Sequence, residues 1–304
     1  MTTRRHVLVV AGLAAALIAT PAMAQGKLQG KIKVVATFSI LGDLVRNVGG
    51  DRVEVATLVG PNSDVHVFSP TPGDAKTLGA ATVVFVNGLG LEGWITRLVQ
   101  ASGSKAPTVV ASTGIKPRKM EDEHRHGHMV TDPHAWQSIA NAKIYVANIR
   151  DGLGKADPAG TSAYEANAAA FLVKLDALEQ EVKAAIGKIP ADHRRIITTH
   201  DAFGYFGGAY GMEFISPEGV STDAQPSAKD MARIIAQIRK QKIPAVFMEN
   251  ITDPRLMQQI AKETGAKIGG TLYSDALSPP DGPAPDYLDM FRHNVGALTA
   301  ALSS

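Results

Sequence analysis

The chain has 304 residues, of which 45% are hydrophobic, 20% charged and 6% aromatic. This composition is typical of a water-soluble globular protein with two domains of about 100–150 residues, and it excludes disordered, collagen-like and polytopic membrane proteins. A net charge of +2 provides no basic surface for nucleic acid. Because the chain has no cysteine, it cannot form a disulfide, a thiol nucleophile or an iron–sulfur cluster, and any bound metal must use nitrogen and oxygen ligands.

The first 24 residues have the three parts of a secretory signal peptide. Arg4 and Arg5 precede an apolar run over residues 7–19, and residues 22–24 form a small-x-small cleavage sequence. The run is too short to span a bilayer, which needs about 20 residues. We therefore expect cleavage after Ala24 and export to the periplasm. Without a cysteine to carry a lipid, the mature protein should be free there.

Residues 25–160 alternate between strand and helix patterns. Short β-branched runs bounded by Gly, Pro, Asn or Ser predict strands over residues 33–37, 53–59, 82–86 and 108–111. Helical spacing of apolar residues predicts helices over residues 40–48 and 94–101. This alternation predicts an α/β lobe with a mostly parallel sheet covered by helices.

A long amphipathic segment follows, and the alternation then resumes. Apolar residues at 3–4 spacing predict one helix of about 25 residues over 161–188. Residues 189–304 read as a second α/β lobe, with strands over 195–199, 245–248 and 267–272 and helices over 231–241 and 256–264. The predicted fold is two α/β lobes of mostly parallel sheet flanked by helices, joined by one long rigid helix.

The sequence also contains one misleading motif. Residues 88–93 fit the pattern GxGxxG and follow a predicted strand. They do not form the first strand–helix turn of the lobe, and no acidic residue follows about 20 positions later to hold a ribose. We interpret these glycines as a tight turn and not as a dinucleotide site.

Three histidines each have an acidic residue and a turn nearby in the sequence: His66, His134 and His200. His66 lies a few residues after the strand predicted over 53–59, and His200 directly follows the strand predicted over 195–199. In open α/β sheets, ligands bind outside the carboxyl ends of the strands. Asp275 likewise follows the strand predicted over 267–272. The alternative for each histidine alone is a hydrogen-bonded, partly buried side chain, and Asp275 alone could be a turn or cap residue.

A second group of histidines lies in the polar segment 121–128 and consists of His124, His126 and His128. Alternating histidines in a glycine-containing polar stretch indicate a short metal-collecting loop. The alternative is an ordinary solvated loop.

The mature chain resembles the metal-specific substrate-binding proteins of bacterial ABC importers, the zinc and manganese uptake group. The likeness runs through the motifs FSIL at 38–41, DVHVFSP at 64–70, NGLGLEGW at 87–94, DPHAW at 132–136, HDAF at 200–203, FME at 247–249 and YSD at 273–275. The resemblance implies one metal between two lobes, bound by His66 and His134 from the first lobe and His200 and Asp275 from the second. It also implies an ABC permease as partner.

The chain departs from the pattern of that group in three places. Residues 64–66 read Asp-Val-His where Asp-Pro-His is more usual, so Val65 replaces a proline. The histidine-rich loop is short, and the second lobe lacks the disulfide of some relatives. The shortness of the loop weakens its assignment as a zinc reservoir.

The expected metal is Zn(II). The resemblance places His200 where manganese-type relatives tend to have a carboxylate, and three imidazoles with one carboxylate suit tetrahedral zinc better than manganese. A manganese- or iron-type uptake protein is the alternative. Other acids should orient the imidazoles. The candidates, which the sequence does not rank, are Asp64, Asp132, Asp201 and Glu249.

Two other functions are compatible with the residues. A zinc hydrolase would use three histidines as ligands and Asp275 as base, but the chain has no HExxH motif and four ligands would leave no open position for water. A zinc buffer or adhesin would use the same site without a transporter. We expect no enzymatic activity, a monomer, and a periplasmic metallochaperone as a possible zinc donor.

Overall fold

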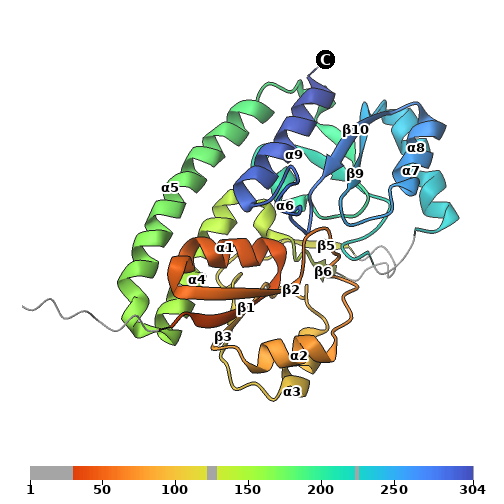
Figure 1. Cartoon of the computed structure of the whole chain (residues 1–304). Coiled ribbons are helices and arrows are strands. Elements are labelled where there is room, and N and C mark those ends of the chain that lie inside the picture. The colour runs from red at the N-terminus through yellow and green to blue at the C-terminus, as the bar shows by residue number, and fades with distance from the viewer. Residues whose placement is uncertain (1–29, 122–128, 223–225, 304) are drawn as a thin grey trace, which may run out of the picture. The chain divides into compact units, whose positions relative to one another are not determined.

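The computed structural model describes residues 30–121, 129–222 and 226–303. The predicted signal peptide and His124, His126 and His128 lie outside these residues. From Lys31 onward the chain forms one compact unit that contains two four-stranded parallel sheets (Figure 1). The predicted α/β fold class is confirmed.

The first sheet has the strand order β2-β1-β3-β4 and is parallel throughout. Its strands are β1 (Ile32–Phe38), β2 (Val53–Val59), β3 (Val83–Val86) and β4 (Thr108–Val110), and its first helices are α1 (Ser39–Gly49), α2 (Pro72–Gly79) and α3 (Ile95–Ser102). Every residue of β3 is buried, as expected for an inner strand of a parallel sheet covered on both faces.

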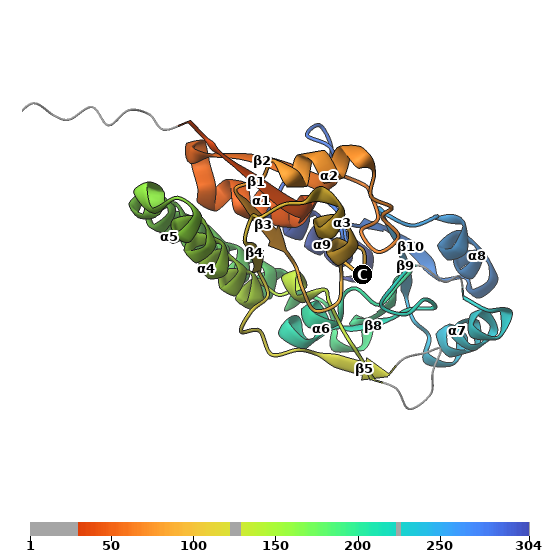
Figure 2. The same ribbon diagram turned by 90° about the horizontal axis from the view of Figure 1, so that it is seen from below.

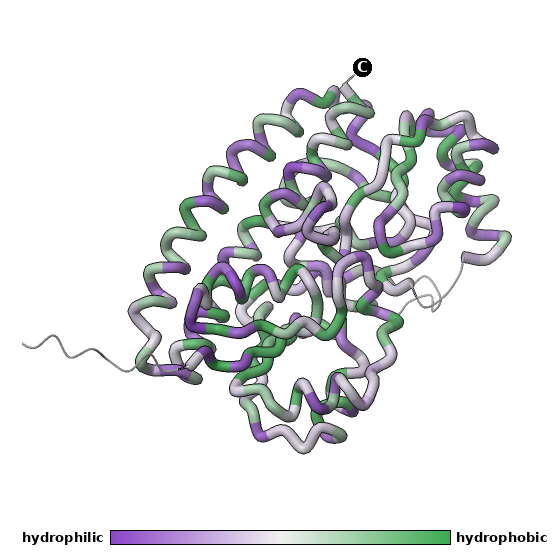
Figure 3. The backbone as a smooth tube through the Cα atoms, viewed as in Figure 1, coloured by the Kyte–Doolittle hydropathy of each residue, from purple (hydrophilic) through white to green (hydrophobic). Residues whose placement is uncertain are grey.

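Two long helices connect the sheets and run side by side in both views (Figures 1 and 2). They are α4 (Ile139–Ala156) and α5 (Thr161–Ile186), and they follow a small antiparallel hairpin of β5 (Lys119–Glu121) and β6 (Met129–Thr131). Hydrophobic and hydrophilic residues alternate along α5 (Figure 3), and its buried positions recur every three or four residues from Tyr164 to Ile186. The predicted linking helix is therefore present, and it packs on α1, α4 and α9 (Tyr287–Leu302).

The second sheet has the order β10-β9-β7-β8, also parallel. Its strands are β7 (Arg195–Ile197), β8 (Glu213–Ile215), β9 (Ala245–Glu249) and β10 (Lys267–Leu272), and its other helices are α6 (Gly204–Tyr210), α7 (Ala228–Gln241) and α8 (Arg255–Thr264). One hydrophobic core extends from the first sheet through α4, α5 and α9 to this sheet. A smaller core lies under α7 and α8.

The glycine-rich segment after β3 is a turn. Gly88 has φ +81°, and a Cβ atom there would lie 2.5 Å from Val110 Cγ1. The Glu92 carboxylate folds back over the turn and accepts the backbone N–H groups of Asn87 and Gly88 at 2.6 and 3.1 Å. Among the described residues, no helix is long and apolar enough to cross a membrane.

Candidate metal centre

Four side chains from distant parts of the chain converge at the boundary between the two sheets. One ligand atom from each of His66, His134, His200 and Asp275 lies within 4.8 Å of every other. His66 lies in the loop after β2, and His134 lies between β6 and a single 3₁₀ turn, η2 (Ala135–Gln137). His200 follows β7 and Asp275 follows β10. The structure thus brings together the four residues that the sequence singled out, which we call the quartet.

The Asp275 carboxylate lies at the centre of the quartet. Its Oδ2 atom is 3.0 Å from His66 Nε2 and 3.1 Å from His200 Nε2. The His134 Nε2 atom is 3.2 Å from His66 Nε2 and 3.5 Å from Asp275 Oδ1. Asp275 Oδ1 is buried and accepts no hydrogen bond within the described part of the chain. Converging ring nitrogens around a buried carboxylate oxygen that lacks a donor fit a bound cation.

Burial differs among the quartet. His134, His200 and Asp275 are fully buried, whereas His66 retains a small exposed fraction and borders a cavity of about 630 Å³. The same cavity is also lined by Leu89–Leu91, Gly93, Val130, Thr131, Pro133, Val220 and Ser221. His66 is therefore the member of the quartet nearest to solvent.

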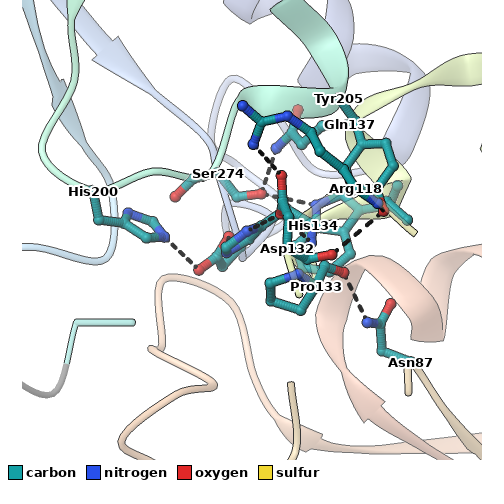
Figure 4. Close-up of polar contacts among 12 residues, drawn as sticks. Asn87, Arg118, Asp132, Pro133, His134, Gln137, His200, Tyr205 and Ser274 are labelled. Atoms are coloured by element: carbon teal, nitrogen blue, oxygen red, sulfur yellow. Dashed lines mark hydrogen bonds and ion pairs between the residues drawn. The ribbon is translucent and has the colours of Figure 1, made fainter. Parts of the chain in front are cut away.

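A carboxylate fixes the orientation of the His134 ring. Asp132 Oδ1 lies 2.9 Å from His134 Nδ1, and Asp132 Oδ2 lies 3.0 Å from the Arg118 guanidinium (Figure 4). An Nδ1–H that donates to Asp132 leaves the Nε2 lone pair free to face the quartet, as in carboxylate–histidine–metal arrangements.

Glu249 occupies the corresponding place behind His200. Its Oε2 atom lies 2.6 Å from His200 Nδ1, although the angle is poor for a hydrogen bond. Its Oε1 atom accepts the backbone N–H groups of Thr199 and His200 at 2.8 and 2.9 Å. Asp64 contacts the backbone instead, since its Oδ1 accepts the His66 N–H at 2.8 Å. For Asp201, the described hydrogen bonds include none to a ring of the quartet.

Two donors from the first half of the chain hold the segment that carries Asp275. The Ser274 carbonyl accepts a hydrogen bond from Trp136 Nε1 at 2.9 Å. It also accepts one from Gln137 Nε2 at 2.7 Å (Figure 4). Because these donors lie two and three residues after His134, they fix Asp275 relative to that histidine. The sequence did not indicate the roles of Arg118, Gln137 and Ser274, because a contact made only in the folded chain leaves no local pattern.

The electrostatics of the quartet favour positive charge. Burial alone lowers the pKa of His134, but the carboxylates of Asp275 and Asp132 outweigh it and raise the pKa to about 9. Burial likewise lowers the pKa of His200, whereas Glu249 and Asp275 raise it well above its usual range. Burial raises the pKa of Asp275, yet the two histidines hold it well below its usual range. A metal ion entering this site must therefore displace protons.

Comparison with known proteins defines the class. Residues 34–301 match the family described as "Zinc-uptake complex component A periplasmic". The class is that of metal-binding substrate-binding proteins, which work with the membrane permeases of ABC importers. The chain belongs to this family, which confirms the resemblance.

Relatives and solved structures agree over nearly the whole chain. The chain is 34% identical to the iron-binding protein YfeA of Yersinia pestis, covering 93% of this chain and 91% of the relative. It is 31% identical to the manganese ABC transporter substrate-binding lipoprotein PsaA of Streptococcus pneumoniae, covering 90% and 89%. The structure is similar to the periplasmic zinc-binding protein TroA of Treponema pallidum, with a TM-score of 0.84, 31% identity and coverage of 90% and 100%. The Mn-bound periplasmic metal-binding protein of Candidatus Liberibacter asiaticus gives a TM-score of 0.79, with 32% identity and coverage of 89% and 99%.

The family consists of solute-binding proteins and not enzymes, which confirms the expectation that the chain is not an enzyme. Membership of this family therefore excludes the zinc-hydrolase alternative. The names of these relatives and solved structures include zinc, manganese and iron. Membership of the family therefore establishes metal binding but not which metal is bound.

Proposed function

We propose that the protein captures Zn(II) in the periplasm through His66, His134, His200 and Asp275 and delivers it to an ABC permease. The spacing of the four ligand atoms supports this proposal. A tetrahedral zinc ion with bonds of about 2.0–2.1 Å separates its ligand atoms by about 3.3 Å. Four contacts in the quartet, counting both oxygens of Asp275, measure 3.0–3.5 Å, and all four ligand atoms lie within 4.8 Å of one another.

The chemistry of the donors favours zinc over manganese. Three ring nitrogens and one carboxylate form a borderline-soft set, whereas manganese prefers more oxygen ligands. The Irving–Williams order also places zinc above manganese and iron(II) for a given set of ligands. A manganese- or iron-type uptake protein remains the alternative, because relatives carry those names.

Location and delivery are part of the same proposal. Residues 1–24 would direct export and be removed, and the mature monomer would act in the periplasm. The His124, His126 and His128 segment would collect zinc or receive it from a metallochaperone. Deleting residues 121–128 should then slow loading from a donor and leave the equilibrium affinity nearly unchanged; an equal fall in affinity would contradict this role.

The test is a competition titration of metal-stripped residues 25–304 with zinc and with manganese against a chelating dye. We expect one tight zinc equivalent that excess manganese barely displaces. His200→Ala should abolish or greatly weaken it. His193→Ala is the matched control, because the His193 ring contacts the Leu302 carbonyl outside the quartet. Tight manganese binding that survives His200→Ala would refute the zinc assignment, and the absence of any tight metal would refute the transport role.

A further inference from the structure

A second polar cavity lies beside the quartet and has a volume of about 530 Å³. The first half of the chain contributes Asp64, from the loop that carries His66. The second half contributes Glu218, Thr222 and residues at the start of α8. The cavity is thus built from both halves of the chain and has carboxylates on both sides.

Glu218 is the unusual residue of this cavity. It is 5% exposed, and within the described part of the chain its carboxylate has neither a hydrogen-bond donor nor an ion-pair partner. Only its backbone is held, by an N–H donated to the Thr199 carbonyl at 3.2 Å. Burial raises the pKa of Glu218 to about 7; His200 opposes this rise, and the carboxylates of Glu249 and Asp64 add to it. The carboxylate of Glu218 lines the cavity, where its oxygens are accessible to a ligand.

Asp64 supplies the second carboxylate. Its Oδ1 atom accepts the His66 N–H at 2.8 Å, and its Oδ2 atom accepts the Thr222 hydroxyl. A carboxylate oxygen has more than one acceptor position, so both atoms retain lone pairs for a further contact. The arginine at the cavity, Arg255, is 86% exposed on its side chain and is ion-paired with Asp253. Arg255 is therefore not the ion-pair partner of Glu218.

We propose that this cavity binds a second divalent cation, weakly, through Glu218 and Asp64. Carboxylate and hydroxyl oxygens are the ligands of hard cations such as Mg²⁺, Ca²⁺ and Mn²⁺, in contrast to the nitrogen-rich quartet. A cation there would join the loop of His66 to the segment of Glu218 and slow the loss of metal from the quartet. The proposal adds to the proposed function and rests on it only for this last effect.

The experiment uses Mn²⁺ as the probe on residues 25–304 loaded with one equivalent of zinc. Bound Mn²⁺ loses the six-line electron paramagnetic resonance signal of the free ion, so a titration counts weakly bound ions. We expect a weak Mn²⁺ equivalent whose affinity falls at least 10-fold in Glu218→Gln and in Glu218→Ala. Glu165→Gln removes an exposed carboxylate from α5 and should leave the titration unchanged.

The number of zinc ions bound and the difference in Mn²⁺ affinity between wild type and the Glu218 variants answer separate questions. The zinc equivalent, measured first in every variant, tests the proposed function and confirms folding. Should zinc fail to load, the same Mn²⁺ titrations without zinc still compare the wild type with the Glu218 variants. Absence of weak Mn²⁺ binding, or equal binding in wild type and both Glu218 variants, would overturn the second site.

Discussion

The Nδ1 atom of His134 lies 2.9 Å from Asp132 Oδ1, and the same carboxylate binds the Arg118 guanidinium on its other oxygen. The carboxylate therefore sets which ring nitrogen of His134 faces the quartet, and its own position is fixed by a cation. This arrangement makes the affinity for metal depend on residues that do not touch the metal.

Asp132→Asn should lower the zinc affinity by about 10- to 100-fold, the usual effect of removing an outer partner of a metal-bound imidazole. The neutral amide is a weaker acceptor for the Nδ1–H and no longer pairs with Arg118. Dye competition measures the change, with the exposed Asp192→Asn as control. An affinity within twofold of wild type would show that Asp132 does not orient the ring.

Gln137→Met should lower the zinc affinity by about 3- to 10-fold, the value of one hydrogen bond. The change removes one of the two donors to the Ser274 carbonyl and so loosens Asp275. Stability of the metal-free protein should change little, because the substitution also removes the unpartnered Gln137 Oε1. Titration and thermal unfolding of the same samples separate the two effects. Equal losses in both would indicate a general packing defect.

Gly269→Ala should destabilise the protein by about 1–3 kcal/mol, the usual cost of overpacking a core. A Cβ atom at Gly269 in β10 would lie 2.3 Å from the buried Phe247 ring. Gly296→Ala in α9 is the control, because a Cβ atom there meets nothing within 4 Å and alanine favours a helix. Urea unfolding measures both variants. Equal stability of the two would contradict the close packing of β10 on Phe247.

Asp43→Asn should make the stability of the metal-free protein less dependent on pH. Burial raises the pKa of Asp43 to about 6, although the carboxylate accepts the Tyr287 N–H at 3.0 Å. A folded-state pKa above the unfolded value contributes stability that is present below about pH 4 and is lost as the pH rises through about 6.

Asparagine keeps the acceptor and does not titrate. The stability of Asp43→Asn relative to wild type should therefore increase between pH 4 and pH 7, by at most about 3 kcal/mol. Urea unfolding at both pH values, with chelator present, measures this difference. A constant difference between the two proteins would show that the pKa of Asp43 is not raised.

The sequence predicted the parts of the fold that local patterns encode. The strands at 53–59 and 267–272 have the predicted bounds, and the helix predicted over 161–188 ends at Ile186. Helix α4 is harder to predict because its interior contains Gly152. That glycine packs on β3, where a Cβ atom would lie 2.9 Å from the Phe85 ring, so a tertiary contact explains a residue that disfavours the helix.

In the candidate site, too, some features are encoded locally in the sequence and others arise only from tertiary contacts. The four proposed ligands stand in recognisable turns near strand ends, and the structure brings together all four that the sequence singled out. Of the acids proposed to orient them, Asp132 and Glu249 lie beside imidazole rings. The sequence could not rank these acids, because an acid next to a histidine in the chain is not always beside its ring. Asp201 follows His200 directly, whereas Glu249 is 49 residues away and contacts the ring.

The His66 and Asp275 side chains that meet in the quartet are separated by 209 positions in the chain. A nascent or partly folded polypeptide has these ligands on unconnected segments, each no better than a free imidazole or carboxylate. Tight metal binding at the proposed site thus requires that β10 has joined its sheet. Under the proposed function, metal retention reports completed folding, and a chain truncated before residue 275 should carry no metal at this site.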